Sequence, residues 1–362
     1  MKIRSVVTLG LLVLASLVLT ASAQAEIQRM DDGKPDFSGT YDITSLTPYT
    51  RNAEFGEKMA FTQDEVDELK RTAHARVDEA AATVDPNRSQ LQALEGEARE
   101  RGVDRSGDYQ PGSHDYFWFD CGGQYCDLYQ VDGKYRTSII IDPPNGQLPS
   151  VSDAGKARRA ALRPYYKPKY PGEAWWLAEG SDPYDNPEGM SLGDRCIYMS
   201  LAVPARPSAY NNMKTIVQSI DHVLIMVEWM HWPRVVRLNS EHLPDDMRSL
   251  GGDSVGWWEE DTLVVETTNF LQAPRVPREG LRIVERFSPI DDGSLLYNFT
   301  VHDPDYVAPY TGEFPWQKSD NRLYEYACHE GNYSMANTLR GARVLESEWI
   351  EKNGPPPDLN EN

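Results

Sequence analysis

The sequence predicts a mainly β protein, in which an antiparallel meander closes into a lipocalin-like up-and-down barrel. Residues 212–317 hold a series of strand-like segments that short turn signals separate, which is typical of successive antiparallel strands. These segments are rich in β-branched and aromatic residues. About eight such strands can close into a barrel, which removes the exposed edges of the sheet. N-terminal helices and a long irregular strap are expected to accompany the barrel.

The N-terminus has the anatomy of a cleavable secretory signal. Lys2 and Arg4 precede an apolar run, Val6–Leu19, and small residues surround Ala25. The run is short for a bilayer span, which needs about 20 residues. We therefore expect residues 1–25 to be a signal peptide. The mature protein is expected in the periplasm or the medium, with no stable membrane insertion after cleavage.

Residues 26–134 are predicted to form an N-terminal helical and irregular region. Its first part is polar and rich in turn residues. Thr62 and Glu65 have the spacing of a capping box, which predicts a helix that runs to about Ala82. A second, highly charged helical stretch is expected over residues 89–101.

Residues 135–211 are predicted to hold a strand, a helix and the strap. The strand is expected over 135–141 and the helix over 152–162. Residues 163–209 are rich in Pro, Gly, Tyr and Trp. So long an irregular segment is uncommon in a compact domain unless it has a purpose, so we expect it to cover the core.

The barrel domain is predicted to span residues 212–345, and a C-terminal tail is expected over 346–362. One segment, 222–230, is apolar on both of its alternating faces, which predicts a strand covered on both sides. The expected strands are 213–220, 222–230, 234–238, 256–258, 263–270, 281–287, 295–302 and 312–317.

Four cysteines in an exported chain indicate disulfides. Cys121 and Cys126 can close on each other, because Gly122-Gly123 permits a tight turn. Cys196 would then pair with Cys328, although the sequence alone allows three pairings. The spacing is not that of a zinc site and no His lies near enough to complete one, so no metal site is predicted.

Several motifs follow one another along the chain, and together they resemble a known family. They are Asp194-Arg195-Cys196, Tyr210-Asn211-Asn212, Glu228 with His231, Trp258-Glu259-Glu260-Asp261-Thr262-Leu263-Val264-Val265-Glu266-Thr267-Thr268-Asn269-Phe270, and Tyr326-Ala327-Cys328-His329-Glu330-Gly331-Asn332-Tyr333. In these motifs the chain resembles a large, mostly uncharacterised family of exported bacterial proteins. The resemblance implies export and a coherent domain, but no activity. Relatives often have Gly where this chain has Glu260, so the turn there is expected to differ.

Glu228 and His231 are the candidate catalytic residues. A carboxylate and an imidazole are the usual general acid and base near neutral pH. The Trp232-Pro233 break would let His231 turn back toward Glu228. The alternative is structural: Glu228 pairs with an Arg on a neighbouring strand and His231 caps the turn.

A second set of polar residues lies on or beside the predicted strands and is expected to bind a ligand. Glu228, Glu266 and Glu285 have mainly apolar neighbours two residues away, so we expect them to face one interior. Ordinary pairing of a buried acid with Arg is the alternative. The candidate ligand-binding residues are Tyr210, Asn211, Asn212, Glu266, Asn269, Glu285, His329 and Glu330.

The composition and the absence of known motifs exclude several classes of function. The net charge is −20, which disfavours nucleic acid as a partner because such binding needs basic residues. Signatures of serine hydrolases, zincins, NTPases and dehydrogenases are absent, so no cofactor is predicted. The leading hypothesis is an exported barrel that binds a small, partly apolar molecule. The alternatives are a cofactor-free acid–base enzyme, such as a lyase, isomerase or hydrolase, and a structural or surface-interaction protein.

Overall fold

The computed structural model describes residues 27–81, 120–123, 125–162, 172–178, 182–199, 202–272, 276–290 and 293–358. The predicted signal peptide and the second charged helix, expected over 89–101, lie outside these residues. Among the helices that the structure describes, none has the length and apolar character needed to cross a membrane.

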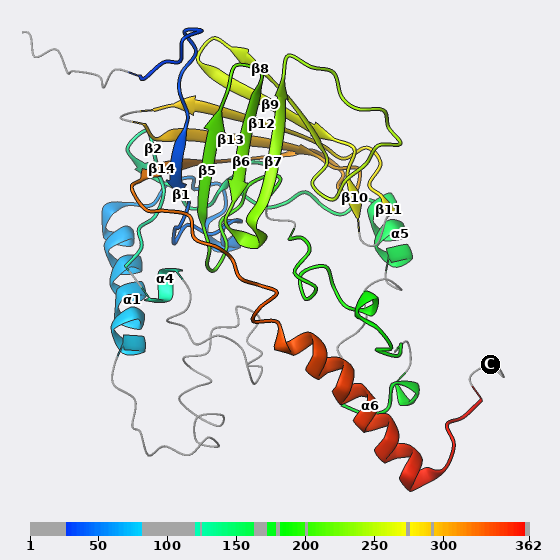
Figure 1. Ribbon diagram of the computed structural model, residues 1–362. Coiled ribbons are helices and arrows are strands. Elements are labelled where there is room, and N and C mark those ends of the chain that lie inside the picture. The colour runs from blue at the N-terminus through cyan, green and yellow to red at the C-terminus, as the bar shows by residue number, and fades with distance from the viewer. Residues whose placement is uncertain are drawn as a thin grey trace, which may run out of the picture.

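Nine strands hydrogen-bond side by side in a closed ring, which confirms the prediction of a mainly β barrel (Figure 1). A tenth strand, β4 (Ile140–Asp142), pairs with the beginning of β14, where it lies opposite Thr311 and Gly312. In their order around the ring the strands are β1 (Gly39–Asp42), β5 (Met213–Gln218), β6 (His222–Val227), β7 (Trp232–Leu238), β8 (Asp253–Glu259), β9 (Thr262–Thr268), β12 (Arg282–Pro289), β13 (Leu295–His302) and β14 (Tyr310–Ser319).

One neighbouring pair in the ring is parallel, so the barrel is not a pure antiparallel meander. β7 and β8 run in the same direction, with Val236 opposite Ser254. A closed ring with an odd number of strands cannot alternate in direction all the way round. The chain meets this constraint by running from the end of β7 back to the start of β8 through residues 239–252.

The strand that closes the ring comes from outside the predicted barrel region. β1 lies between β14 and β5, and Thr40 is opposite both Ser319 and Thr215. The strand has only four residues and begins at a glycine, so its sequence carries little periodicity. The interpretation of residues 26–134 as helical and irregular missed it.

The helices agree with their sequence signals. α1 (Gln63–Ala81) begins at the predicted capping box, where the Thr62 N–H donates to Glu65 Oε2 at 2.7 Å. The expected strand over 135–141 is instead two short strands, β3 (Lys134–Tyr135) and β4. The remaining helices and short strands are α4 (Asp120–Gly123), α5 (Asp153–Leu162), α6 (Tyr333–Asn353), β2 (Gln130–Val131), β10 (Leu271–Gln272) and β11 (Val276–Pro277). α6 continues across residue 346, where the C-terminal tail was expected to begin.

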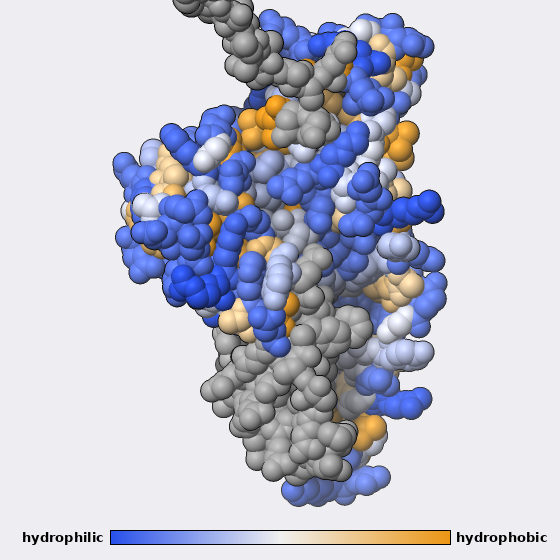
Figure 2. Space-filling model, turned by 90° about the vertical axis from the view of Figure 1, so that its left-hand side faces the viewer, coloured by the Kyte–Doolittle hydropathy of each residue, from blue (hydrophilic) through white to orange (hydrophobic). Residues whose placement is uncertain are grey.

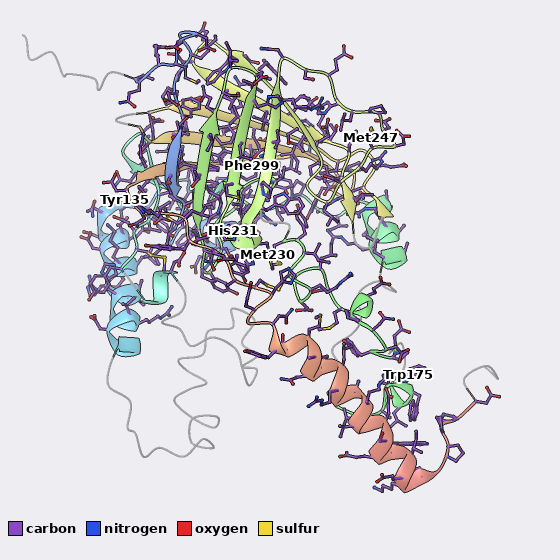
Figure 3. All side chains as sticks on the ribbon, in the orientation of Figure 1. Tyr135, Trp175, Met230, His231, Met247 and Phe299 are labelled. Carbon is purple, nitrogen blue, oxygen red and sulfur yellow. A yellow bond between two sulfur atoms is a disulfide. The ribbon has the colours of Figure 1, made fainter. Side chains whose placement is uncertain are left out.

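Aromatic side chains fill much of the barrel interior. At one end, called here the upper end as in Figure 1, Phe37 packs on Trp258 with ring centroids 5.3 Å apart. Phe299, labelled in Figure 3, lies within the barrel. The barrel interior is therefore largely filled by side chains. The fully buried interior aromatics are Tyr41, Phe287, Tyr297, Phe299, Phe314 and Trp316.

The last part of the strap enters the barrel at its lower end. Ala202, Val203 and Ala205 are buried in the core cluster, and Ala202 forms a β-bridge with Ala205. The Ala205 N–H donates to the hydroxyl of Tyr297 at 2.9 Å. Residues 202–206 therefore cover the core from below, as expected for the strap.

One face of the molecule is largely polar. Figure 2 shows a predominantly hydrophilic face on the side that carries α1, in keeping with the net charge of −20. The outer face of β6 is an exception. Leu224 lies there between Val217 and Val235, each of which is 53% exposed. The expectation that this strand is covered on both faces is therefore wrong for its outer face.

Candidate functional site

Unusual backbone geometry gathers at the lower end of the barrel, where β5 and β7 begin and β1 and β6 end. A 3₁₀ turn, Trp229–His231, joins β6 to β7 there. Asn211, Met230 and His231 have positive φ angles of 58°, 61° and 47°. Figure 3 shows Met230 and His231 together at this end. Left-handed backbone in non-glycine residues is uncommon and clusters at functional sites, so this end is the candidate site.

A buried lysine lies at the centre of the candidate site. Lys214 shares the interior face of β5 with Ile216 and is 2% exposed. Its Nζ donates to the carbonyl oxygen of Met213, at 3.3 Å. An ammonium group carries several N–H donors, and a buried donor without an acceptor is costly. The structure thus leaves hydrogen-bonding capacity of Lys214 unused among the described residues.

The charges of three carboxylates on neighbouring elements influence the pKa of Lys214. They are Asp42 at the end of β1, Asp120 in α4 and Glu228 after β6. Burial lowers the pKa of the lysine to about 8, although all three charges raise it. Burial disfavours the charged form and here outweighs the carboxylates. In the described part of the chain the Nζ of Lys214 is hydrogen-bonded to the carbonyl of Met213 and forms no ion pair with these carboxylates.

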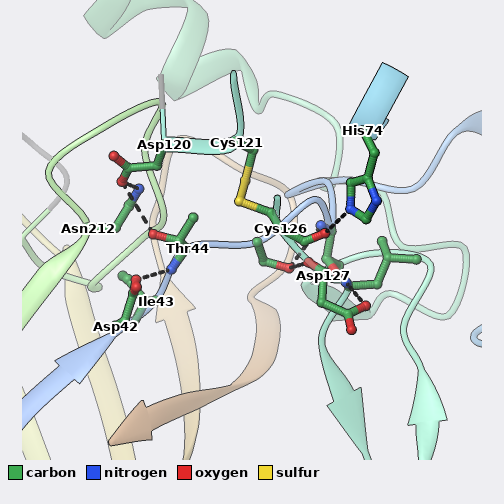
Figure 4. Close-up of a disulfide and its surroundings, with 12 residues drawn as sticks. Asp42, Ile43, Thr44, His74, Asp120, Cys121, Cys126, Asp127 and Asn212 are labelled. Carbon is green, nitrogen blue, oxygen red and sulfur yellow. Dashed lines mark hydrogen bonds between the residues drawn. A yellow bond between two sulfur atoms is a disulfide. The ribbon is translucent and has the colours of Figure 1, made fainter. Parts of the chain in front are cut away.

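Asp120 is held firmly beside the lower end. The Asn212 side chain donates from Nδ2 to Asp120 Oδ2 at 2.7 Å, and the Thr44 hydroxyl donates to the same oxygen at 3.3 Å (Figure 4). Burial raises the pKa of this carboxyl group above its usual value. The next residue, Cys121, is bonded to Cys126, so a disulfide secures the short helix that carries the acid.

The predicted catalytic pair is not assembled. Glu228 is buried, and its Oε2 accepts the N–H of Met213 at 3.1 Å. His231 Nδ1 instead accepts the N–H of Tyr326 at 2.9 Å. That bond requires an unprotonated Nδ1. The two side chains are therefore engaged with different backbone groups, and a direct proton transfer between them has no support in this geometry.

Aromatic rings border the polar cluster. Tyr210 stacks on Trp229 with ring centroids 4.6 Å apart, and Trp229 lies 6.2 Å from the ring of Tyr326. Tyr210 is two residues from Asn212, and Trp229 follows Glu228 directly. The predicted ligand residues Tyr210, Asn211 and Asn212 are thus at the same end as Lys214.

Glu285 is buried in the barrel interior as predicted, but as half of an ion pair. Arg234 Nη1 donates to Glu285 Oε1 at 3.0 Å, and Nη2 contacts Oε2. The hydroxyl of Tyr297 donates to Oε1 at 2.6 Å. Ser254 and Thr267 accept further N–H groups of Arg234. These partners indicate a structural pair, which is the alternative that the sequence left open.

Glu266 does not face the interior. It lies on the outer face of β9, where it pairs with Arg282 and lies 3.4 Å from His242. The expectation that Glu228, Glu266 and Glu285 share one interior is therefore wrong. Glu266 is followed by inward-facing Thr267, so its own side chain must point outward.

Three other predicted ligand residues lie away from the cluster. Asn269 is buried, has a φ of 55° and donates from Nδ2 to the carbonyl of Leu243 at 2.9 Å, which holds the 239–252 connection. His329 and Glu330 are exposed beside the second disulfide. The geometry does not bring these three residues together with Lys214.

Sequence reasoning missed the lysine and Asp120. The same alternation that was applied to the glutamates places Lys214 on the face of Ile216, so Lys214 could have been found from the strand pattern. Asp120 gave no such signal, because it reaches the site only through the packing of α4. The pairing of Arg234 with Glu285 also gave no signal in the sequence, because β7 and β12 are not neighbouring strands and their side chains meet only inside the closed barrel.

The predicted disulfides are both present. Cys121 is bonded to Cys126, and Cys196 to Cys328 across a sequence separation of 132 residues. In the described ranges, no group of His, Cys, Asp and Glu is arranged to hold a metal ion.

Comparison with known proteins gave no match: no family model, no curated protein and no solved structure is similar enough to the chain to count. The family resemblance drawn from the motifs thus stays a prediction.

Burial of the lysine has a measurable cost in stability. The pKa of Lys214 falls from 10.5 to about 8 in the folded protein, so the unfolded chain binds more protons between these values. The penalty is fully present below pH 8 and is relieved as the pH rises to 10.5. We expect Lys214→Met to stabilise the protein by about 3 kcal/mol at pH 7, because one pKa unit corresponds to about 1.4 kcal/mol.

Urea denaturation at pH 7 and at pH 10 measures this effect. The gain from Lys214→Met should shrink at the higher pH. Lys156→Met, which removes an exposed lysine of α5, should change little at either pH. A Lys214 variant that is less stable than the parent at pH 7 would contradict the assignment of Lys214 as a costly buried amine.

Proposed function

We propose that the protein is an exported barrel that binds a small, partly apolar molecule at its lower end. The observation that carries this proposal is the buried amine of Lys214, whose one hydrogen bond among the described residues is long and made to its own neighbouring carbonyl. A costly, poorly satisfied group is retained where it serves a function. A ligand oxygen would supply the acceptor that the lysine lacks.

The surroundings of Lys214 indicate the kind of ligand. Asp42, Asp120 and Glu228 disfavour an anion, so a neutral oxygen acceptor fits better than a carboxylate. The stacked rings of Tyr210 and Trp229 offer an apolar surface to the rest of the molecule. Small-molecule sites commonly combine apolar walls with a few placed polar groups. Export itself rests on the predicted signal peptide, and the disulfides are compatible with it.

We expect a retained ligand in protein purified from its own host. Native mass spectrometry of the exported protein should show an added mass that disappears on denaturation. Lys214→Met should lose this mass, because the polar anchor is gone. Glu330→Gln, a change in an exposed carboxylate outside the cluster, is the matched control and should keep it.

The same measurement separates the competing functions. If neither the parent nor the control carries a ligand, and small neutral carbonyl compounds give no thermal shift, the barrel is structural and the proposal fails. If Lys214→Met retains the ligand as well as the parent does, the binding site lies elsewhere.

A further inference from the structure

We propose that Lys214 binds its ligand covalently, as an imine formed with an aldehyde or ketone. This inference rests on the proposed function and names the class of the ligand. It also goes beyond that function, because a hydrogen-bonded complex would need no reaction at the lysine.

The amine of Lys214 is buried away from water. Lys214 is 2% exposed, whereas Lys156 on α5 has a side chain that is 67% exposed. Imines hydrolyse readily in water, so a site that excludes water favours them. The amine has no carboxylate in ion-pair contact among the described residues, so its nitrogen lone pair is not tied up once the proton is lost.

Charged groups face this amine from three elements: Asp42 from β1, Glu228 from the end of β6, and Asp120 from α4. Their charges favour the ammonium, and burial opposes them. With a pKa of about 8, about a tenth of the Lys214 amine is neutral at pH 7. An ordinary lysine, with a pKa of 10.5, is almost entirely protonated there.

The reaction needs only the carbonyl compound and proton transfers. The neutral Nζ attacks the carbonyl carbon, an N–C bond forms, and the π electrons move to the oxygen, which takes up a proton. The nitrogen of this carbinolamine then loses its remaining protons, while the hydroxyl group takes up a second proton and leaves as water. The products are a C=N bond and one water molecule, and no oxidant or reductant takes part.

Asp120 is the group in the cluster best suited to supply the proton for the departing hydroxyl. Burial raises its pKa, so it holds a proton more readily than an exposed carboxyl group does. Asn212 and Thr44 both donate to one of its oxygens, Oδ2, which leaves Oδ1 as the site for the proton. Glu228, by contrast, uses a carboxylate oxygen to accept the Met213 N–H.

The experiment traps the imine with benzaldehyde and sodium cyanoborohydride. The full-length exported protein is treated at pH 7, digested and mapped by mass spectrometry. We expect the peptide with Lys214 to gain one N-benzyl group at least tenfold faster than the peptide with Lys156. The rate at Lys214 should rise with pH and level off once the pH is well past the pKa of about 8, where nearly all of the amine is neutral.

Two variants sharpen the test. Asp120→Asn keeps the shape but removes both the acidic proton and a charge that favours the ammonium form of Lys214. The lost charge alone would speed trapping at Lys214, so slower trapping there, with trapping at Lys156 unchanged, would report the lost proton donor, and faster trapping would contradict that role for Asp120. Lys156→Met should leave trapping at Lys214 unchanged. If Lys214 is modified no faster than Lys156 in the unaltered protein, the inference is wrong, and no variant needs to fold for that result.

The outcome also distinguishes this inference from the proposed function. Benzaldehyde that protects the protein against thermal unfolding, but is not trapped at Lys214, would overturn the imine and leave non-covalent binding in place. Benzaldehyde that neither binds nor reacts would overturn the imine, and native mass spectrometry of host-purified protein would then decide the binding proposal by itself.

Discussion

Replacing Glu285 by Gln should destabilise the protein by about 3–5 kcal/mol, because it leaves Arg234 charged and uncompensated inside the barrel. Glu285 is fully buried and Arg234 is 4% exposed. The carboxylate also accepts the hydroxyl of Tyr297, which in turn accepts the N–H of Ala205 from the strap. Urea denaturation monitored by tryptophan fluorescence would measure the loss.

The matched control is Glu266→Gln on the outer face of the neighbouring strand. Glu266 also pairs with an arginine, but Arg282 is 45% exposed, so the change should cost less than about 1 kcal/mol. The double variant Arg234→Met with Glu285→Gln should recover much of the lost stability, because no buried charge remains. Equal costs for the two single variants would show that the interior pair is not the structural unit described here.

The second large effect concerns the disulfide between Cys196 and Cys328. It closes a loop with a sequence separation of 132 residues, so replacing both cysteines by Ser should cost about 5 kcal/mol in the chain-entropy model. The Cys121–Cys126 loop spans a separation of only 5 residues, and its removal should cost about 2 kcal/mol. Denaturation of the two double-serine variants would compare them.

Comparing the two losses of stability tests whether the Cys196–Cys328 disulfide lies within the part of the protein that unfolds cooperatively with the barrel. If removing Cys196 and Cys328 costs less than removing the short disulfide, the segment with Cys328 would be separating from the barrel before the barrel unfolds. A loss that matches the loop length would show that both cysteines belong to the cooperative unit that holds the strands together.

The strands could be predicted because their signals are local. Segment 295–302 alternates between apolar and polar residues, and the structure has β13 with the same bounds. β1 could not be predicted, since a four-residue strand that begins with Gly39 gains its hydrogen bonds only after Ser319 and Thr215 lie beside it. The parallel pairing of β7 with β8 also depends on the closed ring, and the sequence of neither strand indicates it.

The candidate site was predicted in part. Asn212 and Glu228 were chosen from motifs and do lie around the lower end. Their hydrogen-bond partners could not be predicted, because the sequence indicates which face of a strand a side chain takes but not which residue it contacts. Glu228 and His231, three residues apart, look like a pair in the sequence. Glu228 is instead bonded to Met213 on the neighbouring strand β5, and His231 to Tyr326, 95 residues further along the chain. Asp120 reaches the cluster from a helix whose position only packing determines.

The connection between β1 and β5 has a consequence for how the surroundings of Lys214 can be altered. Asp42 lies opposite Met213, so the two strands pair directly although residues 43–212 separate them along the chain. That connection leaves and re-enters the barrel at the lower end and carries Asp120, whereas Lys214 lies on β5 itself. Part of the connection is tied to the barrel, since Tyr129 and Ala202 lie in the core cluster and β4 pairs with β14. A substitution at Asp120, which is only partly buried, should therefore change the polarity around Lys214 without breaking the hydrogen-bonded ring of strands.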